Sequence, residues 1–192
     1  MILFADGITI TAAEHQSILH LVASPEDWVR GAIAEKVRLR RDALILEWRP
    51  KLLADPEVTE LPADSDAFAA LIIGRADYRS RAQSDAEIGE VPYLNNIARY
   101  QAVNRSGSTV TLFPSGIDIP DADCNCMLAY IQDIDDWILG ALLGYINRGK
   151  KRMLSEYHPI ILADPDVTTT PATEDGLIQM ITARSDYRRL AG

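Results

Sequence analysis

Cysteine and histidine are scarce in this sequence, which has two cysteines and three histidines among 192 residues. So few thiols exclude a disulfide-stapled scaffold, and so few soft ligands leave little for a multi-residue zinc site. The two cysteines, Cys124 and Cys126, are separated by one residue, a spacing that strains a disulfide between them. We therefore expect reduced thiols, with an intermolecular disulfide as the alternative.

Long apolar runs and excess positive charge are also missing. No stretch of about 18 apolar residues occurs, so the sequence predicts no transmembrane helix. Residues 1–7 have neither the basic start nor the apolar core of a signal peptide, so we expect synthesis in a cytoplasm. The net charge of −9 argues against general affinity for nucleic-acid phosphates or anionic membranes. What remains is the composition of an ordinary folded protein, 47% hydrophobic and 24% charged.

A repeat is the most informative feature that the sequence does have. Residues 1–83 align with residues 110–192 at a constant offset of 109 without a gap, and 28 of the 83 aligned positions are identical. A match of this length indicates a duplicated module rather than a short solenoid repeat. We therefore expect module one at 1–83, an ordered connector at 84–109 and module two at 110–192, and we expect function in features that both modules keep.

Each module opens with a pattern typical of a β-hairpin. In module one, Asp6-Gly7 separates two short apolar-alternating runs, 2–5 and 8–11. In module two, Gly116 keeps the position that requires a positive φ. A two-stranded hairpin is marginal alone, so it must pack on helices or on a partner.

Three helices are expected to follow the hairpin. Thr11 to Glu14 has the spacing of a capping box, and Ser24-Pro25 is typical of the start of a second helix that runs to about residue 53. Pro50 and Pro159 should kink or end the long helices near their last turns. The predicted fold is therefore α+β and helix-dominated, with two homologous β-hairpin plus three-helix modules in a pseudo-twofold relation.

Polar and aromatic residues that occur in both modules are the candidate site residues. The strongest motif is Arg-x-Asp-Tyr-Arg; an internal Arg–Asp pair with a tyrosine packed on the long helix explains it without chemistry. The two shared glutamates could form a carboxylate pair across the twofold axis, but salt bridges to those arginines are the favoured alternative. The two tryptophans are expected to be core anchors. These structural candidates are Trp28, Trp137, Glu47, Glu156, Arg75, Asp77, Tyr78, Arg184, Asp186 and Tyr187.

Two further patterns suggest phosphate binding only weakly. Gly144 to Lys151 is similar to a P-loop, but it lacks the Ser or Thr after the lysine and lies in a predicted helix. Basic runs occur at 36–41 and 148–152, and a solvated face that pairs with the surplus acids explains them better than a nucleic-acid patch. We predict no catalytic residue, no metal and no cofactor.

The motifs of each module resemble those of a known group of proteins. Trp-x-x-x-Ala at Trp28, Leu-x-x-Asp-Pro at 52–56, Leu-Pro-Ala-Asp at 61–64 and Asp-Tyr-Arg at 77–79 are similar to small uncharacterised proteins encoded in phage and prophage structural-gene clusters. The resemblance covers 28–79 and 137–188, roughly half the chain. It implies a component of the bacteriophage virion, in the tail, baseplate, fibre attachment or neck, and it carries over no catalytic residue.

The functional expectation is therefore a non-enzymatic structural or adaptor protein. Its partners would be other virion proteins in a symmetric assembly, with no membrane and little nucleic-acid contact. The hairpin edges are expected to add to a neighbour's sheet through the alternate side chains Leu3, Ile8, Ile10, Leu112, Ile117 and Ile119. Two alternatives remain open: a cytoplasmic regulatory or assembly factor that touches nucleic acid, and a carboxylate-dependent hydrolase.

Overall fold

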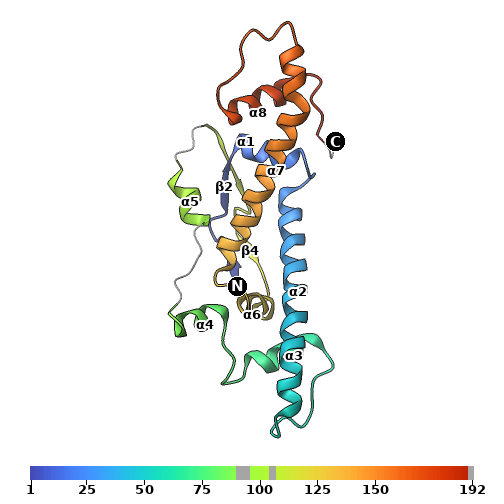
Figure 1. The fold of residues 1–192 in the computed structure, drawn as a ribbon, viewed down its shortest axis with the longest axis vertical. Helices are drawn as coiled ribbons and strands as arrows, with labels where there is room; N and C mark the ends of the chain where they lie inside the picture. Colours follow the sequence, from blue (N-terminus) through green and yellow to red (C-terminus); the bar gives the residue numbers. More distant parts are fainter. Residues whose placement is uncertain (90–95, 104–106, 190–192) are drawn as a thin grey trace.

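Two long helices set the length of the molecule. The computed structural model describes residues 1–89, 96–103 and 107–189, and Figure 1 shows α2 (Pro25–Ala54) and α7 (Ile134–Ala163) running toward opposite ends of an elongated body. The described residues form an α+β fold dominated by helix. The shorter elements are β1 (Ile2–Leu3), β2 (Ile8–Thr11), α1 (Ala12–Leu19), α3 (Ser65–Ile73), α4 (Arg81–Glu87), α5 (Asn96–Ala102), β3 (Thr109–Leu112), β4 (Ile117–Asp118), α6 (Asp121–Leu128) and α8 (Glu174–Ala183).

Local sequence signals account for the boundaries of the long helices. The Ser24 hydroxyl accepts a hydrogen bond from the Asp27 amide at 3.1 Å, and Pro25 occupies the first turn, as predicted. Asp133 caps α7 in the same way. Each helix continues past its proline by one turn, to Ala54 and Ala163. Each proline removes one backbone hydrogen bond to the carbonyl four residues earlier, and because it lies near the C-terminal end only one further turn follows this break.

The strands lie close to their predicted positions but pair differently. β1 is antiparallel to β4, and β2 is antiparallel to β3, so the predicted local hairpins are wrong. The Asp6-Gly7 turn does form, since the Gly7 amide donates to the Phe4 carbonyl at 2.7 Å. Yet this turn does not fold the chain back on itself. Residue 2 pairs with 118 and residue 8 with 112, and both sums are 120, so segments 1–11 and 109–119 run antiparallel in one register.

The six side chains predicted to bind a partner strand are buried within the chain itself. Each is at most 4% exposed and belongs to the central core, so none is available to a neighbouring protein in this fold. This corrects the expected role of the hairpin edges, because apolar alternation here serves the chain's own core. The six are Leu3, Ile8, Ile10, Leu112, Ile117 and Ile119.

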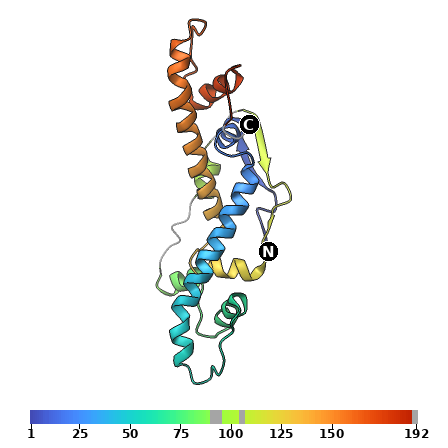
Figure 2. The same ribbon diagram turned by 90° about the vertical axis from the view of Figure 1, so that its right-hand side faces the viewer.

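The helices of the two halves pack in a crossed arrangement. α1 comes early in the chain but packs on α7 and α8, whereas α6 packs on α2 and α3. Figures 1 and 2 show the result as one lobe at each end, which we call the α2–α3–α6 lobe and the α7–α8–α1 lobe. Each lobe has its own apolar cluster: Leu44, Trp48 and Phe68 with Cys126 in the first, and Met153 and Ile178 with others in the second. The compact units of the structure therefore combine segments from both halves of the sequence.

The two tryptophans lie where the long helices cross. Trp28 stacks on Tyr145 with ring centroids 4.1 Å apart, and the Lys36 ammonium lies 4.9 Å from the centre of the Trp137 ring. Both tryptophans are half-buried against the central core. They join α2 to α7, so they contribute to the packing of the crossing rather than filling a fully buried core position.

Part of the connector is ordered against α7. The Asn96 amide donates to the Asp136 carboxylate at 2.8 Å, and the Ile97 backbone amide donates to its other oxygen at 2.9 Å. The Tyr100 hydroxyl donates to Glu14 at 2.7 Å, which ties α5 to the start of α1. The expected order of the connector cannot be followed through 90–95 and 104–106, which lie outside the described residues.

The contact between α1 and α7 gives a direct test of the crossed packing. A methyl group added at Gly149 of α7 would collide with the Ser17 backbone of α1, whereas Gly144 of the same helix faces open space. We expect Gly149→Ala to lower the free energy of unfolding by about 3 kcal/mol or more, because a backbone cannot yield as a side-chain tip can. Gly144→Ala should raise it by about 0.5–1 kcal/mol, since alanine favours helix. Urea denaturation measures both, and equal effects of the two substitutions would contradict the packing.

Candidate functional site

The Arg-x-Asp-Tyr-Arg motif clamps the end of each long helix to the segment that follows the next helix. Arg75 donates to Asp55 and to Asp77, both at 2.8 Å. Arg184 makes the same pair of bonds with Asp164 and Asp186, both at 2.8 Å. The predicted internal ion pair is therefore present at both sites, and in each it includes the aspartate directly after the long helix.

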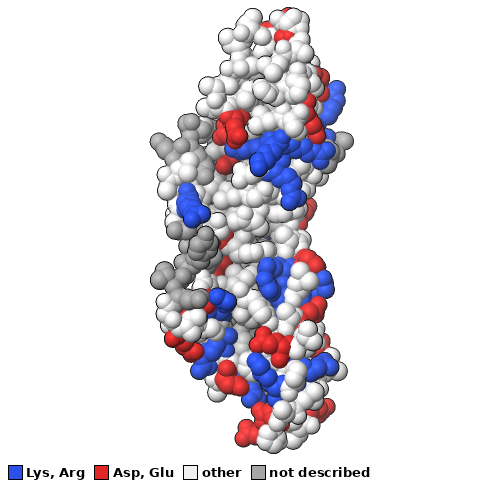
Figure 3. All heavy atoms as spheres, in the orientation of Figure 1, with Lys and Arg blue, Asp and Glu red and all other residues white. Residues whose placement is uncertain are grey.

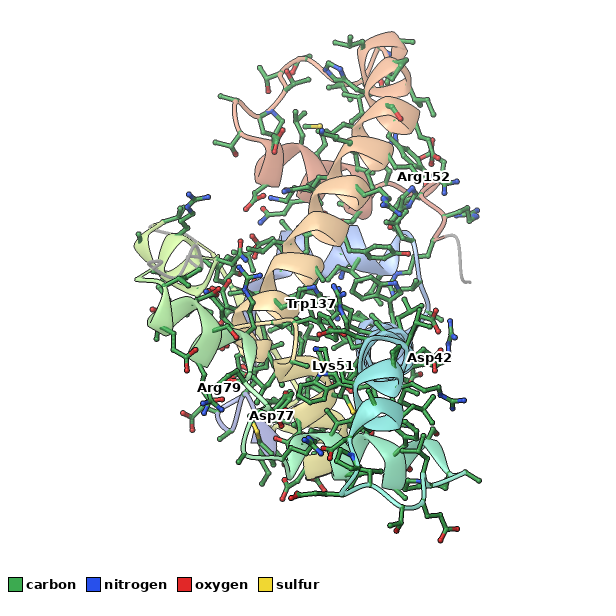
Figure 4. The ribbon with its side chains drawn as sticks, turned by 60° about the horizontal axis from the view of Figure 1, so that its bottom comes forward. Asp42, Lys51, Asp77, Arg79, Trp137 and Arg152 are labelled. Carbon is green, nitrogen blue, oxygen red and sulfur yellow. The ribbon has the colours of Figure 1, made fainter. Side chains whose placement is uncertain are left out.

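In these ion pairs each arginine and its two aspartates favour the charged form of one another. The Arg75 guanidinium holds the pKa of the Asp77 carboxyl below its usual range. For Asp55, the Glu57 backbone amide is the main cause of a lowered pKa, followed by Arg75. These ion pairs are partly exposed and therefore modest in energy, but the bidentate geometry of each Arg–Asp pair within the motif fixes its orientation. Tyr78 packs against the apolar cluster of the α2–α3–α6 lobe and Tyr187 against that of the α7–α8–α1 lobe, so the structure does not bring the two motifs together. Figure 4 shows Asp77 and Arg79 of the first motif apart from Arg152 of α7.

The motif tyrosines pack beneath the clamps. Tyr78 lies beside Trp48 with ring centroids 6.1 Å apart, and Tyr187 lies 5.5 Å from Tyr157 and 5.9 Å from His20. Both tyrosine hydroxyls are buried and have no hydrogen-bond partner among the described residues. Burial raises the pKa of Tyr78 and of Tyr187. An orphaned buried hydroxyl costs free energy, so these two positions are candidates for a ligand or a bound water.

The two shared glutamates neither meet each other nor bind the motif arginines. Glu47 accepts from Lys51 at 3.1 Å and from the Tyr130 hydroxyl at 3.2 Å. The corresponding interactions of Glu156 come from Arg152 at 2.7 Å and from His20 at 3.0 Å. The expected bonds to the arginines are therefore wrong, because α6 and α1 cross over to supply Tyr130 and His20. Since each glutamate serves a different lobe, they offer no joint acid–base geometry.

The basic runs are occupied by contacts within the chain. Figure 3 shows Lys and Arg interspersed with Asp and Glu over one face of the body. Their ion pairs include Arg38–Glu35, Arg38–Asp42, Arg41–Asp66, Lys150–Asp175 and Arg152–Glu156, with N–O distances of 2.6–3.2 Å. Lys36, Arg40 and Arg148 lie over the rings of Trp137, Tyr130 and Tyr145. This pairing with the chain's own acids is the arrangement that the sequence favours.

The P-loop-like stretch and the cysteines show no ligand-binding geometry. Residues 144–151 lie inside α7, where the backbone amides are committed to the helix and cannot surround a phosphate. Cys124 and Cys126 are free and buried, and burial raises the pKa of both thiols. Within 1–89, 96–103 and 107–189, no group of three or more His, Cys, Asp or Glu side chains has metal-site geometry. No helical stretch in those ranges combines the length and hydropathy of a membrane span.

A pocket of about 360 Å³ opens in the α2–α3–α6 lobe. We call it the Ala129 pocket; its lining includes Glu47, Trp48, Tyr78, Arg79, Ala129 and Tyr130. In this pocket Glu47 and the motif residues Tyr78 and Arg79 meet Ala129 and Tyr130, which follow α6 in the second half of the chain. Sequence reasoning missed the contribution of α6, although the change from His20 to Ala129 at aligned positions is a visible signal of a difference between the lobes.

The pocket gives a titration that can be measured. Burial, followed by the Glu47 carboxylate, raises the pKa of Tyr130 to about 12. Because the folded state then holds this proton more tightly than the unfolded state, the stability it contributes is complete below pH 10 and is lost as the pH rises toward 12. We expect the difference between the ultraviolet tyrosinate titrations of the wild type and Tyr130→Phe to have its midpoint near 12. A midpoint near 10 would show that the hydroxyl is free in water.

Comparison of the chain with protein-family models, curated proteins and solved structures finds no match. The function is therefore inferred from the contacts of the chain and from the resemblance of its motifs.

Proposed function

We propose that the chain is built from two homologous modules, 1–83 and 110–192, related by an approximate twofold axis and joined by 84–109. The strand register supports this relation. Ile2 pairs with Asp118 and Thr9 pairs with Thr111, and adding 109 to 2 and to 9 gives 111 and 118. A twofold axis requires this exchange, in which residue i of one copy meets residue j of the other and the reverse.

Equivalent contacts in the two lobes support the same relation. Arg41 pairs with Asp66 at 2.7 Å and Lys150 with Asp175 at 2.6 Å, and both residues of the second pair lie 109 positions after those of the first. The bounds of α2 and α7 are also offset by 109 at both ends. Two homologous modules would give this agreement in charge pairing and helix length.

The function that we propose on this basis is that of a non-enzymatic structural or adaptor component of a bacteriophage virion. The main observation in its support is an exposed leucine near the C-terminal end of each long helix; we call these two ends the tips. Leu53 near the end of α2 is 70% exposed, and Leu162 near the end of α7 is 68% exposed. These positions are again 109 residues apart, and the helices that carry them, α2 and α7, run toward opposite ends of the body (Figure 1). Single exposed leucines are ordinary, but the same leucine displayed twice gives one chain two like contact surfaces.

The surroundings of the tips fit protein contact better than catalysis. At the α7 tip a shallow pocket of about 480 Å³ is lined by Pro159, Ile160, Ala163 and Pro165, with Asp164 and Arg184. The Arg184–Asp164 bond holds this tip in shape, and the Arg75–Asp55 bond does the same at the other. A rigid body with an exposed leucine at each tip can bridge two subunits of a symmetric ring or fibre. This role agrees with the resemblance to phage structural-cluster proteins, and its partners would be other virion proteins.

The two rival functions have less support. A nucleic-acid-binding assembly factor needs basic side chains that are free to meet phosphates, whereas most of the basic-run residues contact acids or rings of the chain. A carboxylate-dependent hydrolase needs two acids within reach of one substrate, whereas Glu47 and Glu156 serve separate lobes.

Substitution of the tip leucines tests the adaptor function. We expect Leu53→Asp and Leu162→Asp each to lower incorporation into particles at least ten-fold, because a charge at the centre of an apolar contact must be desolvated. Mass spectrometry of purified particles measures incorporation. Leu46→Asp is the matched control: Leu46 is 77% exposed on α2, but the aligned residue of α7 is Ser155, so it belongs to no repeated surface.

The outcomes separate the proposal from its rivals. All three variants should remain folded, since each leucine is exposed, and circular dichroism verifies this. Wild-type chain absent from purified particles would overturn the virion function. Equal incorporation of all three variants would instead reject the tips as the contact surfaces.

A further inference from the structure

The two lobes differ at one interior position. His20 is the C-cap residue of α1, and Ala129 is the C-cap residue of α6. These residues are 109 positions apart, and each faces the shared glutamate of the lobe into which its helix crosses. One lobe therefore holds an imidazole ring where the other has a methyl group.

The imidazole of His20 is held from three sides. His20 is 2% exposed, and its Nε2 lies 3.0 Å from the Glu156 carboxylate. Its ring stacks on Tyr187 at 5.9 Å with an interplanar angle of 25°, and it meets Tyr157 edge-on at 6.3 Å. Arg152, and then His20, hold the pKa of Glu156 below its usual value. The carboxylate therefore accepts, and the imidazole N–H donates.

The Ala129 pocket has residues equivalent to those around His20, but it contains no imidazole ring. Glu47, Trp48 and Tyr78 line the pocket, and they align with Glu156, Tyr157 and Tyr187, the three residues that contact His20. Two of the three are identical, and the third exchanges one aromatic ring for another. The pocket's volume of about 360 Å³ falls in the range of small-molecule sites.

A carboxylate oxygen in the pocket can accept from a ligand. The Tyr78 hydroxyl is buried without a partner among the described residues, and so is the Tyr187 hydroxyl beside His20, so the ring of the other lobe does not bind this group. Among the described residues, one Glu47 oxygen accepts the 3.2 Å bond of the Tyr130 hydroxyl, and the other accepts the 3.1 Å bond of Lys51. A carboxylate oxygen has capacity for a second donor, so a ligand N–H can bind there without displacing Tyr130.

We propose that the Ala129 pocket binds an imidazole ring, placed beside Trp48 and Tyr78 with its N–H donated to Glu47, as His20 is placed in the other lobe. The ring belongs either to a free small molecule or to a histidine side chain of a peptide, since both present the same chemistry. A pocket larger than one imidazole leaves room for the atoms attached to it. The inference rests on the equivalence of the lobes and is independent of membership in a virion.

Titration of the full chain with imidazole, followed by ¹H–¹⁵N NMR, tests the site. We expect the Trp48 indole and the Ala129 amide to shift, with the tips unaffected. Ala129→His fills the pocket with the ring seen at the other end and should weaken imidazole binding at least ten-fold. His20→Ala should create a second site, seen as new shifts at Tyr157 and Tyr187. Oxazole, a ring of the same size without an N–H donor, should bind at least ten-fold more weakly.

Further measurements keep the test decisive. If Ala129→His does not fold, Glu47→Gln preserves the shape of the pocket and should reduce imidazole affinity at least five-fold. A capped Gly-His-Gly peptide that binds more tightly than imidazole would identify a histidine side chain as the source, and weaker binding would identify a free heterocycle. The proposal is overturned if the wild-type Ala129 pocket shows no shift with imidazole, whatever the result for His20→Ala, or if oxazole binds as well as imidazole. Neither result bears on incorporation into particles, so the two proposals fail separately.

Discussion

The antiparallel pairing of residues 1–11 with residues 109–119 determines where every other element lies. β2 ends at Thr11 and α1 begins at Ala12, so no loop separates the strand from the helix. Once β2 pairs with β3, α1 must therefore lie beside α7. Gly149 of α7 has no side chain, so the backbone of α1 at Ser17 can approach it closely. On the other side β4 is followed by α6 after two residues, which brings α6 onto α2. Strand pairing and helix crossing are thus one constraint.

This arrangement makes each half depend on the other for stability. Two-stranded sheets are marginal in water, so these strands persist because Leu3, Ile10 and Ile117 are at most 1% exposed beneath the crossing helices. The Met1 ammonium also donates to the Ile119 carbonyl at 3.0 Å, which fastens the end of the pairing. Contacts between residues more than a hundred positions apart must close a long loop before they gain stability. Folding is therefore expected to be slow relative to a local helical bundle.

Local features could be predicted from the sequence, and non-local ones could not. The Thr11–Glu14 capping box, the Ser24 cap and the Arg75–Asp77 pair depend on residues within a few positions of one another. The strand partners depend on which surface buries the apolar side chains, and a turn such as Asp6-Gly7 is compatible with more than one pairing. The same reason explains the candidate site. Glu47 finds Tyr130 and Glu156 finds His20 only because α6 and α1 cross, and no local pattern encodes that crossing.

If the two modules are homologous as proposed, their sequences agree at the tips and differ in the interior of the lobes. The clamp of arginine and two aspartates and the exposed leucine are kept at both ends, as a bridging protein requires of its contact surfaces. Two of the changed positions lie where a crossing helix meets a long helix: Gly149 aligns with Arg40, and His20 with Ala129. Arg40 lies over the Tyr130 ring, whereas Gly149 lets α1 approach α7 directly. One lobe therefore closes around its own histidine while the other keeps a pocket. The two interiors can differ without altering the tips. The Arg–Asp bonds that hold each tip do not include the residues that differ in the interior, so the two sets of residues act independently.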